Sequence, residues 1–171
     1  VNNIYTLASY FGKEFYESDR IAPINVSQHT VICGFAIAGR IVAKKLAEKD
    51  INFVIISDNL NHVLLARERG FQAYFGHLDK RPVLESLKVE QAASVIITVN
   101  TLLSKKIICQ AVLNYDPSAQ VIVKISSLAE KKSLQGIGIT DFVHAYQETA
   151  RLLVKSSLAH RKATSPIPKS E

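Results

Sequence analysis

The stretch "VICGFAIAG" (residues 31–39) places a short apolar run directly before a turn that contains two glycines. A β-branched run followed by glycine and then by helix-favouring residues predicts a strand, a tight turn and a helix. The turn has the spacing of the G-x-G-x-x-G dinucleotide fingerprint, with Gly34 and Gly39 in the first and third places and Ala36 in the second. We expect the N–H groups that open the helix to attract an anion, although the Ala36 methyl group loosens the fit around phosphate.

The chain beyond this turn alternates between strand-like and helix-like segments. Short β-branched runs predict strands at 29–33, 52–57, 71–75, 94–98, 120–125 and 141–145. Apolar residues at helical spacing follow each run, most clearly over 101–115, 127–138 and 147–158. Because the strands are apolar throughout, we expect helices on both faces of the sheet. The pattern predicts a Rossmann-like α/β fold with a doubly wound, parallel, six-stranded sheet.

Three regions are expected along the chain. Residues 29–158 form the Rossmann domain, residues 1–28 a connector, and residues 159–171 a flexible tail rich in polar residues and proline. The connector carries a helical stripe that predicts packing against this domain, a second copy or a missing part of the protein, namely Ile4, Leu7, Ala8, Phe11 and Phe15. Because the chain starts with Val1 and has no secretory signal, we expect it to be a piece of a longer protein.

Composition excludes several classes of function. The net charge of +6 invites a nucleic-acid hypothesis, but the basic residues are scattered and no basic stripe is interleaved with aromatic residues. No apolar stretch approaches the roughly 20 residues of a membrane helix. The cysteines, Cys33 and Cys109, lie in apolar patterns, which predicts buried thiols in a reducing, cytoplasmic setting.

Catalytic and metal chemistry have little support in the sequence. The five histidines never pair with Cys, Asp or Glu at metal-ligand spacing, so no metal site is predicted. No G-x-S-x-G nucleophile turn is present. A dehydrogenase needs a further region for substrate, and the given chain ends soon after the sixth predicted strand, so we expect no enzyme activity.

The glycine turn itself leaves three interpretations open. It is a site for an adenine mononucleotide or dinucleotide, a degenerate pocket in an interaction module, or part of an NAD(P)-dependent oxidoreductase-like domain. The fingerprint includes an acidic residue roughly 20 residues after the last glycine, and Asp58 follows Gly39 by 58 − 39 = 19 positions. Ser57 ends the predicted strand, however, and alternation leaves open whether Asp58 faces the pocket.

A wider set of motifs is more specific than the glycine turn. The ordered series of strand, glycine turn, "RERGFQAYFGH" (67–77), "LESLKVEQAASVIIT" (84–98) and "LQGIGITDFV" (134–143) resembles the TrkA-N domain, also called the RCK or KTN domain. Domains of this family regulate bacterial potassium channels and Kef-type potassium/proton antiporters. The resemblance covers about residues 29–158 and implies a homodimer or higher assembly attached to a transmembrane transport domain, at the cytoplasmic face of the inner membrane.

The resemblance also implies a nucleotide site that borders the ends of several strands. The ligand it implies is ATP, ADP, AMP or NAD(H). The residues it assigns to the site are Gly34, Phe35, Ala36, Ile37, Ala38, Gly39, Ser57, Asp58, Asn59, Gly76, His77, Leu78, Thr98, Val99, Asn100 and Lys124.

This sequence departs from the family at three of those positions. Ala36 replaces a glycine, Ser57 stands where the family has its ribose-binding acid, and His77 stands where an aspartate usually follows the glycine. Two missing carboxylates favour a ligand held mainly through phosphate, or no ligand at all, over a tightly bound NAD(H). The apolar residues of helix 101–115 are candidates for a dimer contact or for the core, namely Leu102, Leu103, Ile107, Ile108 and Val112.

Overall fold

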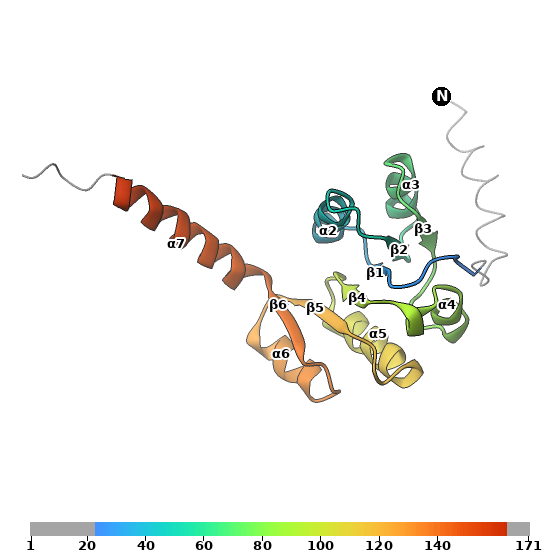
Figure 1. Cartoon of the computed structure of the whole chain (residues 1–171). Coiled ribbons are helices and arrows are strands. Elements are labelled where there is room, and N and C mark those ends of the chain that lie inside the picture. The colour runs from blue at the N-terminus through green and yellow to red at the C-terminus, as the bar shows by residue number, and fades with distance from the viewer. Residues whose placement is uncertain (1–22, 164–171) are drawn as a thin grey trace, which may run out of the picture.

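The computed structural model describes residues 23–163 and contains a six-stranded sheet between two layers of helices (Figure 1). The sheet is parallel throughout, with the strand order β3-β2-β1-β4-β5-β6. The strands are β1 (Thr30–Cys33), β2 (Phe53–Ser57), β3 (Ala73–Phe75), β4 (Ser94–Ile97), β5 (Val121–Ile125) and β6 (Asp141–His144). This is the Rossmann-like, doubly wound arrangement that the sequence predicts.

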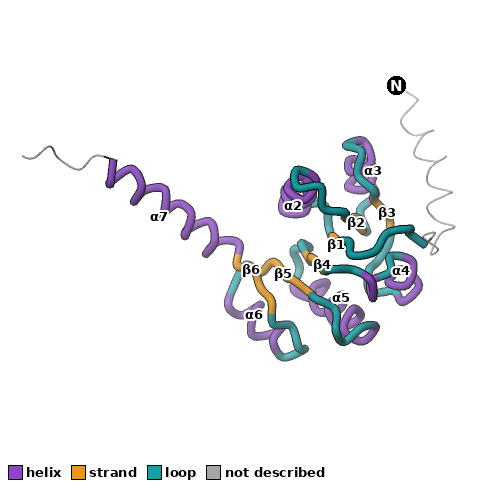
Figure 2. Tube along the Cα trace, in the orientation of Figure 1, coloured by secondary structure: helices purple, strands orange, loops and turns teal. Residues whose placement is uncertain are grey.

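The helices lie on both faces of the sheet, as Figures 1 and 2 show. They are α2 (Ile37–Ala47), α3 (Leu60–Glu68), α4 (Arg81–Ser86), α5 (Leu102–Tyr115), α6 (Leu128–Gln135) and α7 (Ala145–Ala163), with a 3₁₀ turn, η1 (Val89–Gln91). Helices α2 and α3 cover one face, and α4, α5 and α6 cover the other. Helix α7 stands away from the sheet.

Strand β1 shows why the central strands are apolar throughout. Val31 and Cys33 face the core cluster under α4, α5 and α6, whereas Ile32 faces the cluster under α2 and α3. Successive side chains of a strand point to opposite faces, so a strand covered on both sides needs apolar residues at every position. Strand β6 departs from this pattern: Asp141 and Val143 are exposed at the edge of the sheet.

The parallel strands place their carboxyl ends at one edge of the sheet. Cys33 at the end of β1 pairs with Ile56 of β2 on one side and with Ile97 of β4 on the other. Between β1 and β4 the chain order reverses, because α2 and α5 leave the edge toward opposite faces. A crevice at such a point is the usual ligand position in open α/β sheets.

Two segments near the expected domain limits have structure that the sequence does not predict. Ile24, near the end of the expected connector, is buried in the core and its N–H donates to the Ser86 carbonyl oxygen at 3.0 Å. The last helix was expected to end at residue 158, but α7 continues to Ala163. The connector stripe and the rest of the tail, residues 1–22 and 164–171, lie outside the described residues.

Within residues 23–163, no helix combines the length and the apolar character that crossing a membrane requires.

Candidate functional site

The glycine turn after β1 has a geometry that requires its two glycines. Gly34 has φ +96°, and a Cβ atom there would lie 2.9 Å from the Thr98 hydroxyl oxygen. A Cβ atom on Gly39 would overlap the backbone carbonyl oxygen of Gly34. The Thr98 hydroxyl contacts the carbonyl oxygens of Cys33 and Gly34 at 3.0 Å each, which fixes the turn against β4. Gly34 therefore permits the tight turn, and Gly39 lets α2 pack closely against it, which are the structural roles of the first and third glycines of the fingerprint.

Ala36 is the N-cap residue of α2. Its backbone is extended, and its methyl group cannot accept a hydrogen bond from the first turn of the helix. The first turn also contains no acidic residue. The opening N–H groups of a helix lack intrahelical partners, so this end of α2 carries partial positive charge beside the turn.

A cavity of about 380 Å³ opens at this edge of the sheet. The ends of β1, β2, β3 and β4, the first turn of α3 and the first two turns of α5 surround it. Its lining residues are Cys33, Gly34, Phe35, Ala36, Ser57, Asp58, Asn59, His62, Gly76, His77, Leu78, Asp79, Thr98, Val99, Asn100, Thr101, Ser104, Ile107 and Ile108.

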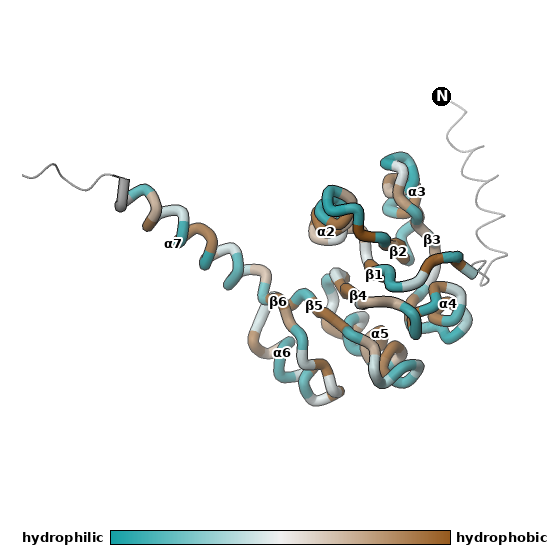
Figure 3. The backbone as a smooth tube through the Cα atoms, in the orientation of Figure 1, coloured by the Kyte–Doolittle hydropathy of each residue, from teal (hydrophilic) through white to brown (hydrophobic). Residues whose placement is uncertain are grey.

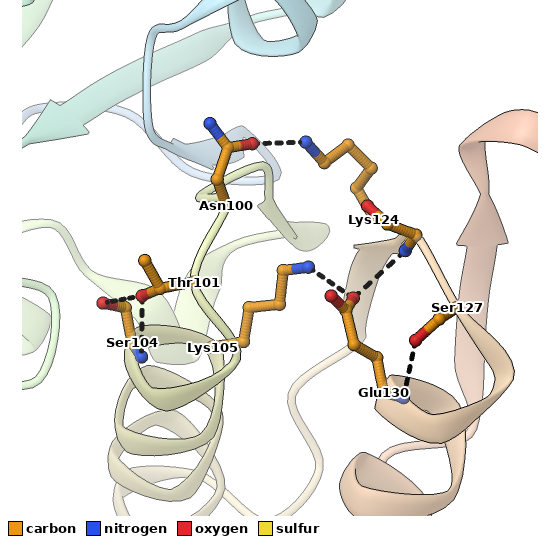
Figure 4. A network of polar contacts seen from close by, with 8 residues as sticks. Asn100, Thr101, Ser104, Lys105, Lys124, Ser127 and Glu130 are labelled. Atoms are coloured by element: carbon orange, nitrogen blue, oxygen red, sulfur yellow. Dashed lines mark hydrogen bonds and ion pairs between the residues drawn. The ribbon is translucent and has the colours of Figure 1, made fainter.

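Most of the residues that the sequence assigns to the site line this cavity. The exceptions are Ile37, Ala38, Gly39 and Lys124. Ile37 is 70% exposed at the start of α2, and Gly39 is buried against Gly34. Lys124 does not line the cavity itself. Its ammonium group donates a hydrogen bond, at 2.7 Å, to the side-chain oxygen of Asn100, which does line the cavity (Figure 4).

The end of β2 resolves the question about Asp58. Ser57 is buried, and its hydroxyl oxygen accepts a hydrogen bond from the Asn59 N–H at 3.2 Å. Asp58 is exposed and lines the cavity. The strand end therefore still carries a carboxylate, one residue later than the family position at Ser57.

Sequence reasoning missed several lining residues, namely Cys33, His62, Asp79, Thr101, Ser104, Ile107 and Ile108. Capping residues were the signal that could have found some of them. The Asn59 side chain accepts from the His62 N–H, and the Thr101 hydroxyl accepts from the Ser104 N–H. Each cap fixes the first turn of its helix at the strand end, which brings that turn to the cavity.

The charged lining is acidic rather than basic. Asp58 and Asp79 supply carboxylates, and Asp79 pairs with Lys80 at 3.0 Å. Burial, with the negative charge of Asp58 as a smaller cause, raises the pKa of the Cys33 thiol to about 12. Among the described residues, no lysine or arginine lines the cavity. The groups beside the cavity that can face an anion are thus the N-termini of α2, α3 and α5 and the imidazoles of His62 and His77.

A polar network lies behind the cavity at the start of α5 (Figure 4). The Lys105 ammonium group donates to the Glu130 carboxylate at 2.7 Å, and the same carboxylate oxygen accepts from the Ser126 N–H at 3.1 Å. Burial and the nearby charge of Lys105 lower the pKa of Lys124. The network connects the helix that borders the cavity to β5 and α6.

Comparisons with known proteins agree with this architecture. The family model of the TrkA-N domain matches residues 30–145. The chain is 28% identical over 143 residues to K(+) efflux antiporter 2, chloroplastic, of Arabidopsis thaliana, a match that covers 84% of this chain and 12% of the antiporter. It is 23% identical over 150 residues to the putative cation/proton antiporter YbaL of Escherichia coli, covering 88% and 27%. The chain thus spans a small part of these relatives.

Solved structures share the fold. The TrkA-N domain of inner membrane protein ybaL from Escherichia coli superposes with a TM-score of 0.70 at 22% identity, covering 77% of this chain and 98% of that chain. The Kef C-terminal domain of Shewanella denitrificans, in an AMP-bound form, gives 0.65 at 14% identity, covering 77% and 79%. The GsuK channel bound to NAD gives 0.64 at 21% identity, covering 81% and 26%. A GsuK structure bound to ADP gives 0.64 at 22% identity, covering 82% and 39%.

Proposed function

The chain belongs to the TrkA-N domain family, and on that premise we propose that it is a ligand-sensing regulatory domain, without catalytic activity, of a potassium channel or potassium/proton antiporter. The observation that carries the proposal is the cavity at the carboxyl edge of the sheet, bordered by the glycine turn and the start of α2. A helix N-terminus that opens onto a cavity favours an anionic ligand such as a phosphate.

The ligand that fits this cavity is an adenine nucleotide held through one phosphate and its ribose. A cavity of about 380 Å³ lies at the small end of the range for small-molecule sites, which favours a mononucleotide over a dinucleotide. The Asp58 carboxylate, at the end of β2, is placed to accept hydrogen bonds from a ribose diol. AMP, NAD and ADP are the ligands of the structural relatives, which supports the same class of compound.

The names and lengths of the relatives support the proposed regulatory role. The two relatives named above are a K(+) efflux antiporter and a putative cation/proton antiporter, and the chain corresponds to 12% and 27% of their length. We therefore place the domain at the cytoplasmic face of a membrane, attached to a transport domain and paired with a second copy. A ligand controls such an assembly only if it binds one arrangement of the two copies more tightly than the other.

Isothermal titration calorimetry with AMP, ADP, ATP, NADH and adenosine tests the proposal directly. We expect AMP to bind, and we expect Ala36→Asp to abolish its binding, because the new carboxylate occupies the position that faces the phosphate. Aspartate is a good N-cap residue, so the variant should fold. Absence of heat with every nucleotide, in protein that melts cooperatively, would favour an interaction module with an unused pocket. Hydride transfer from NADH to an added acceptor, above a no-protein control, would instead favour an oxidoreductase.

A further inference from the structure

Residues 23–28, which we call the entry segment, carry the chain into β1 without forming a helix or a strand. Hydrophobic and hydrophilic positions alternate along this segment (Figure 3). Ile24 is buried in the core cluster under α4, α5 and α6, and Val26 packs against the same cluster while partly buried. The entry segment is therefore held to the domain by alternate side chains, without a strand partner.

Two backbone hydrogen bonds join the entry segment to the rest of the described chain. The Ile24 N–H donates to the Ser86 carbonyl oxygen at 3.0 Å, and the Gln28 N–H donates to the Gln91 carbonyl oxygen at 2.8 Å. Ser86 is the last residue of α4 and Gln91 the last residue of η1, so both bonds fasten the segment to one short stretch of chain. A segment with so few hydrogen bonds opens at a lower free energy than the sheet beside it.

His29 follows the entry segment directly and is fully buried. Its Nε2 atom lies 3.0 Å from the Leu87 carbonyl oxygen, which can only accept, so Nε2 carries the hydrogen of the neutral imidazole. Nδ1 is then a bare acceptor. Nδ1 is buried and has no hydrogen-bond partner among the described residues. The atom that would take up a proton thus lies where nothing can accept a hydrogen bond from it.

A proton on Nδ1 would introduce a buried charge and an unpaired N–H group, and both are costly away from water. Burial accordingly lowers the pKa of His29 below its ordinary value of 6.5, although the Leu87 hydrogen bond and Glu90 favour the charged form. Lys88 disfavours it. Glu90 and Lys88 are the charged residues that act on this imidazole within the described part of the chain. The closed arrangement therefore excludes the proton.

Backbone strain lies on both sides of the contact between His29 and Leu87. Gln28, which precedes His29, has φ +52°, and Lys88, which follows Leu87, has φ +46°. Residues other than glycine rarely adopt this left-handed conformation, because it costs free energy. Release of the Gln28 hydrogen bond lets Gln28 return to an ordinary conformation. The strain thus favours opening at the point where His29 holds the segment.

The sheet side of His29 is fixed more firmly than the entry segment. The His29 carbonyl oxygen accepts from the Ala93 N–H at 2.8 Å, directly before β4. The N–H of Thr30, the next residue, donates to the Asn52 carbonyl oxygen at 2.9 Å, directly before β2. The chain at the start of β1 is thereby bonded on both sides. The entry segment is the part beside His29 that can move without breaking the sheet.

We propose that His29 is a proton-sensitive switch: its neutral imidazole holds the entry segment closed on α4 and η1, and uptake of a proton from water at Nδ1 releases that segment while β1 stays in the sheet. Both ring N–H groups of the released imidazolium then donate to water. The advantage of the closed state is complete above the ordinary value of 6.5 and is lost as the pH falls towards the lowered value. In the regulatory domain proposed above, the switch adds a response to protons that needs no ligand in the cavity.

Amide hydrogen exchange, followed by nuclear magnetic resonance on the 171-residue chain, tests the switch. We expect the protection factors of the Ile24 and Gln28 N–H groups to fall by up to about tenfold between pH 7.5 and pH 5.5, because the released imidazole titrates near 6.5. Urea below the unfolding transition should leave both protection factors unchanged and lower that of the Thr30 N–H, since local opening exposes little surface. Equal urea dependence, or no protection of Ile24 and Gln28 at pH 7.5, would overturn the proposal.

Two histidine variants assign the response to His29. His29→Gln keeps a donor for the Leu87 carbonyl oxygen but cannot titrate, so the protection of Ile24 and Gln28 should be the same at both pH values. His144→Gln is the matched control, because Nδ1 of His144 already accepts from the Gln147 N–H at 3.3 Å. It should retain the wild-type pH response. A response that persists in His29→Gln, or disappears in His144→Gln, would contradict the assignment.

A measurement on the wild type alone checks the tautomer. Long-range proton–nitrogen spectra at pH 7.5 should show a hydrogen on Nε2 of His29 and none on Nδ1. A hydrogen on Nδ1 instead would remove the basis of the switch. None of these results bears on nucleotide binding, which is measured separately with AMP, so the switch and the proposed function can fail independently.

Discussion

The Lys105 ammonium group lies 2.7 Å from the Glu130 carboxylate, and the lysine side chain is completely buried. Lys105 belongs to α5, which borders the cavity, and Glu130 belongs to the first turn of α6. Burial raises the pKa of Glu130, but the hydrogen bond from Lys105 and that from the Ser126 N–H outweigh it, so the net pKa lies below its ordinary value. The pair therefore fastens the central half of the sheet to its β5–β6 edge.

Breaking this pair from the acidic side should destabilise the domain strongly. Glu130→Ala leaves the buried Lys105 charge without a partner, which costs about 3 kcal/mol in the free energy of unfolding. Lys105→Met removes the buried charge and keeps apolar volume, so its cost should be smaller. Urea denaturation of both variants checks the order. A smaller loss for Glu130→Ala than for Lys105→Met would show that the Lys105 charge is stabilised by something else.

His29 should make the stability of the domain dependent on pH. Its imidazole is fully buried, Nε2 lies 3.0 Å from the Leu87 carbonyl oxygen, and Nδ1 has no hydrogen-bond partner among the described residues. Burial lowers the pKa of His29 below its ordinary value of 6.5, although the Leu87 hydrogen bond and Glu90 oppose the shift.

The unfolded chain therefore takes up a proton at higher pH than the folded chain. The stability that neutral His29 supplies is complete above the unfolded value of 6.5 and is lost as the pH falls through the folded value. We expect the melting temperature of the wild type to drop between pH 7.5 and pH 5 by more than that of His29→Gln, whose amide can still donate to Leu87. Parallel curves for the two proteins would contradict this assignment.

The contact between Gly39 and the glycine turn should tolerate no side chain. Gly39→Ala places a methyl group against the Gly34 carbonyl oxygen, so α2 must shift away from β1. Overpacking of this kind costs about 1–3 kcal/mol. Gly136→Ala is a suitable control, because its new methyl group would meet its nearest neighbours at 3.7 Å. Thermal unfolding should separate the two variants, and equal melting temperatures would argue against the tight packing.

Asp58 should determine whether a ribose is recognised. Asp58→Asn removes the carboxylate that we assign to the ribose diol, so AMP affinity should fall by about tenfold. The affinity for 2′,3′-dideoxyadenosine monophosphate should change little, because that compound has no diol. Calorimetry with both compounds provides the measurement. A loss of the same size for both would indicate that Asp58 acts through general charge or folding.

The fold was predictable because each strand and turn has a local signature. The apolar runs located the strands, and Gly34 and Gly39 indicated the close approach of α2 to β1, which depends on the absence of two Cβ atoms. Strand β6 was harder to characterise. Its exposed Asp141 and Val143 reflect a position at the sheet edge, which the sequence of one strand does not specify.

The site was only partly predictable for a related reason. Asn59 and Asn100 lie within three residues of the ends of β2 and β4, and both line the cavity, as does most of the set expected from the sequence. His62 reaches the cavity from the first turn of α3 and Ile107 from the second turn of α5, and their direction depends on how each helix is capped and packed. The assignment of nucleotide binding to these residues stays a prediction.

The floor and the rim of the cavity differ in how freely their residues can be substituted during evolution. The floor, where Thr98 holds the carbonyl groups of Cys33 and Gly34, admits almost no substitution without moving the backbone. The rim is built from side chains such as Asp58 and His77, which are exposed and can be exchanged at little structural cost. Descendants of this scaffold can therefore acquire new ligand preferences by rim substitutions while inheriting the same anchoring point.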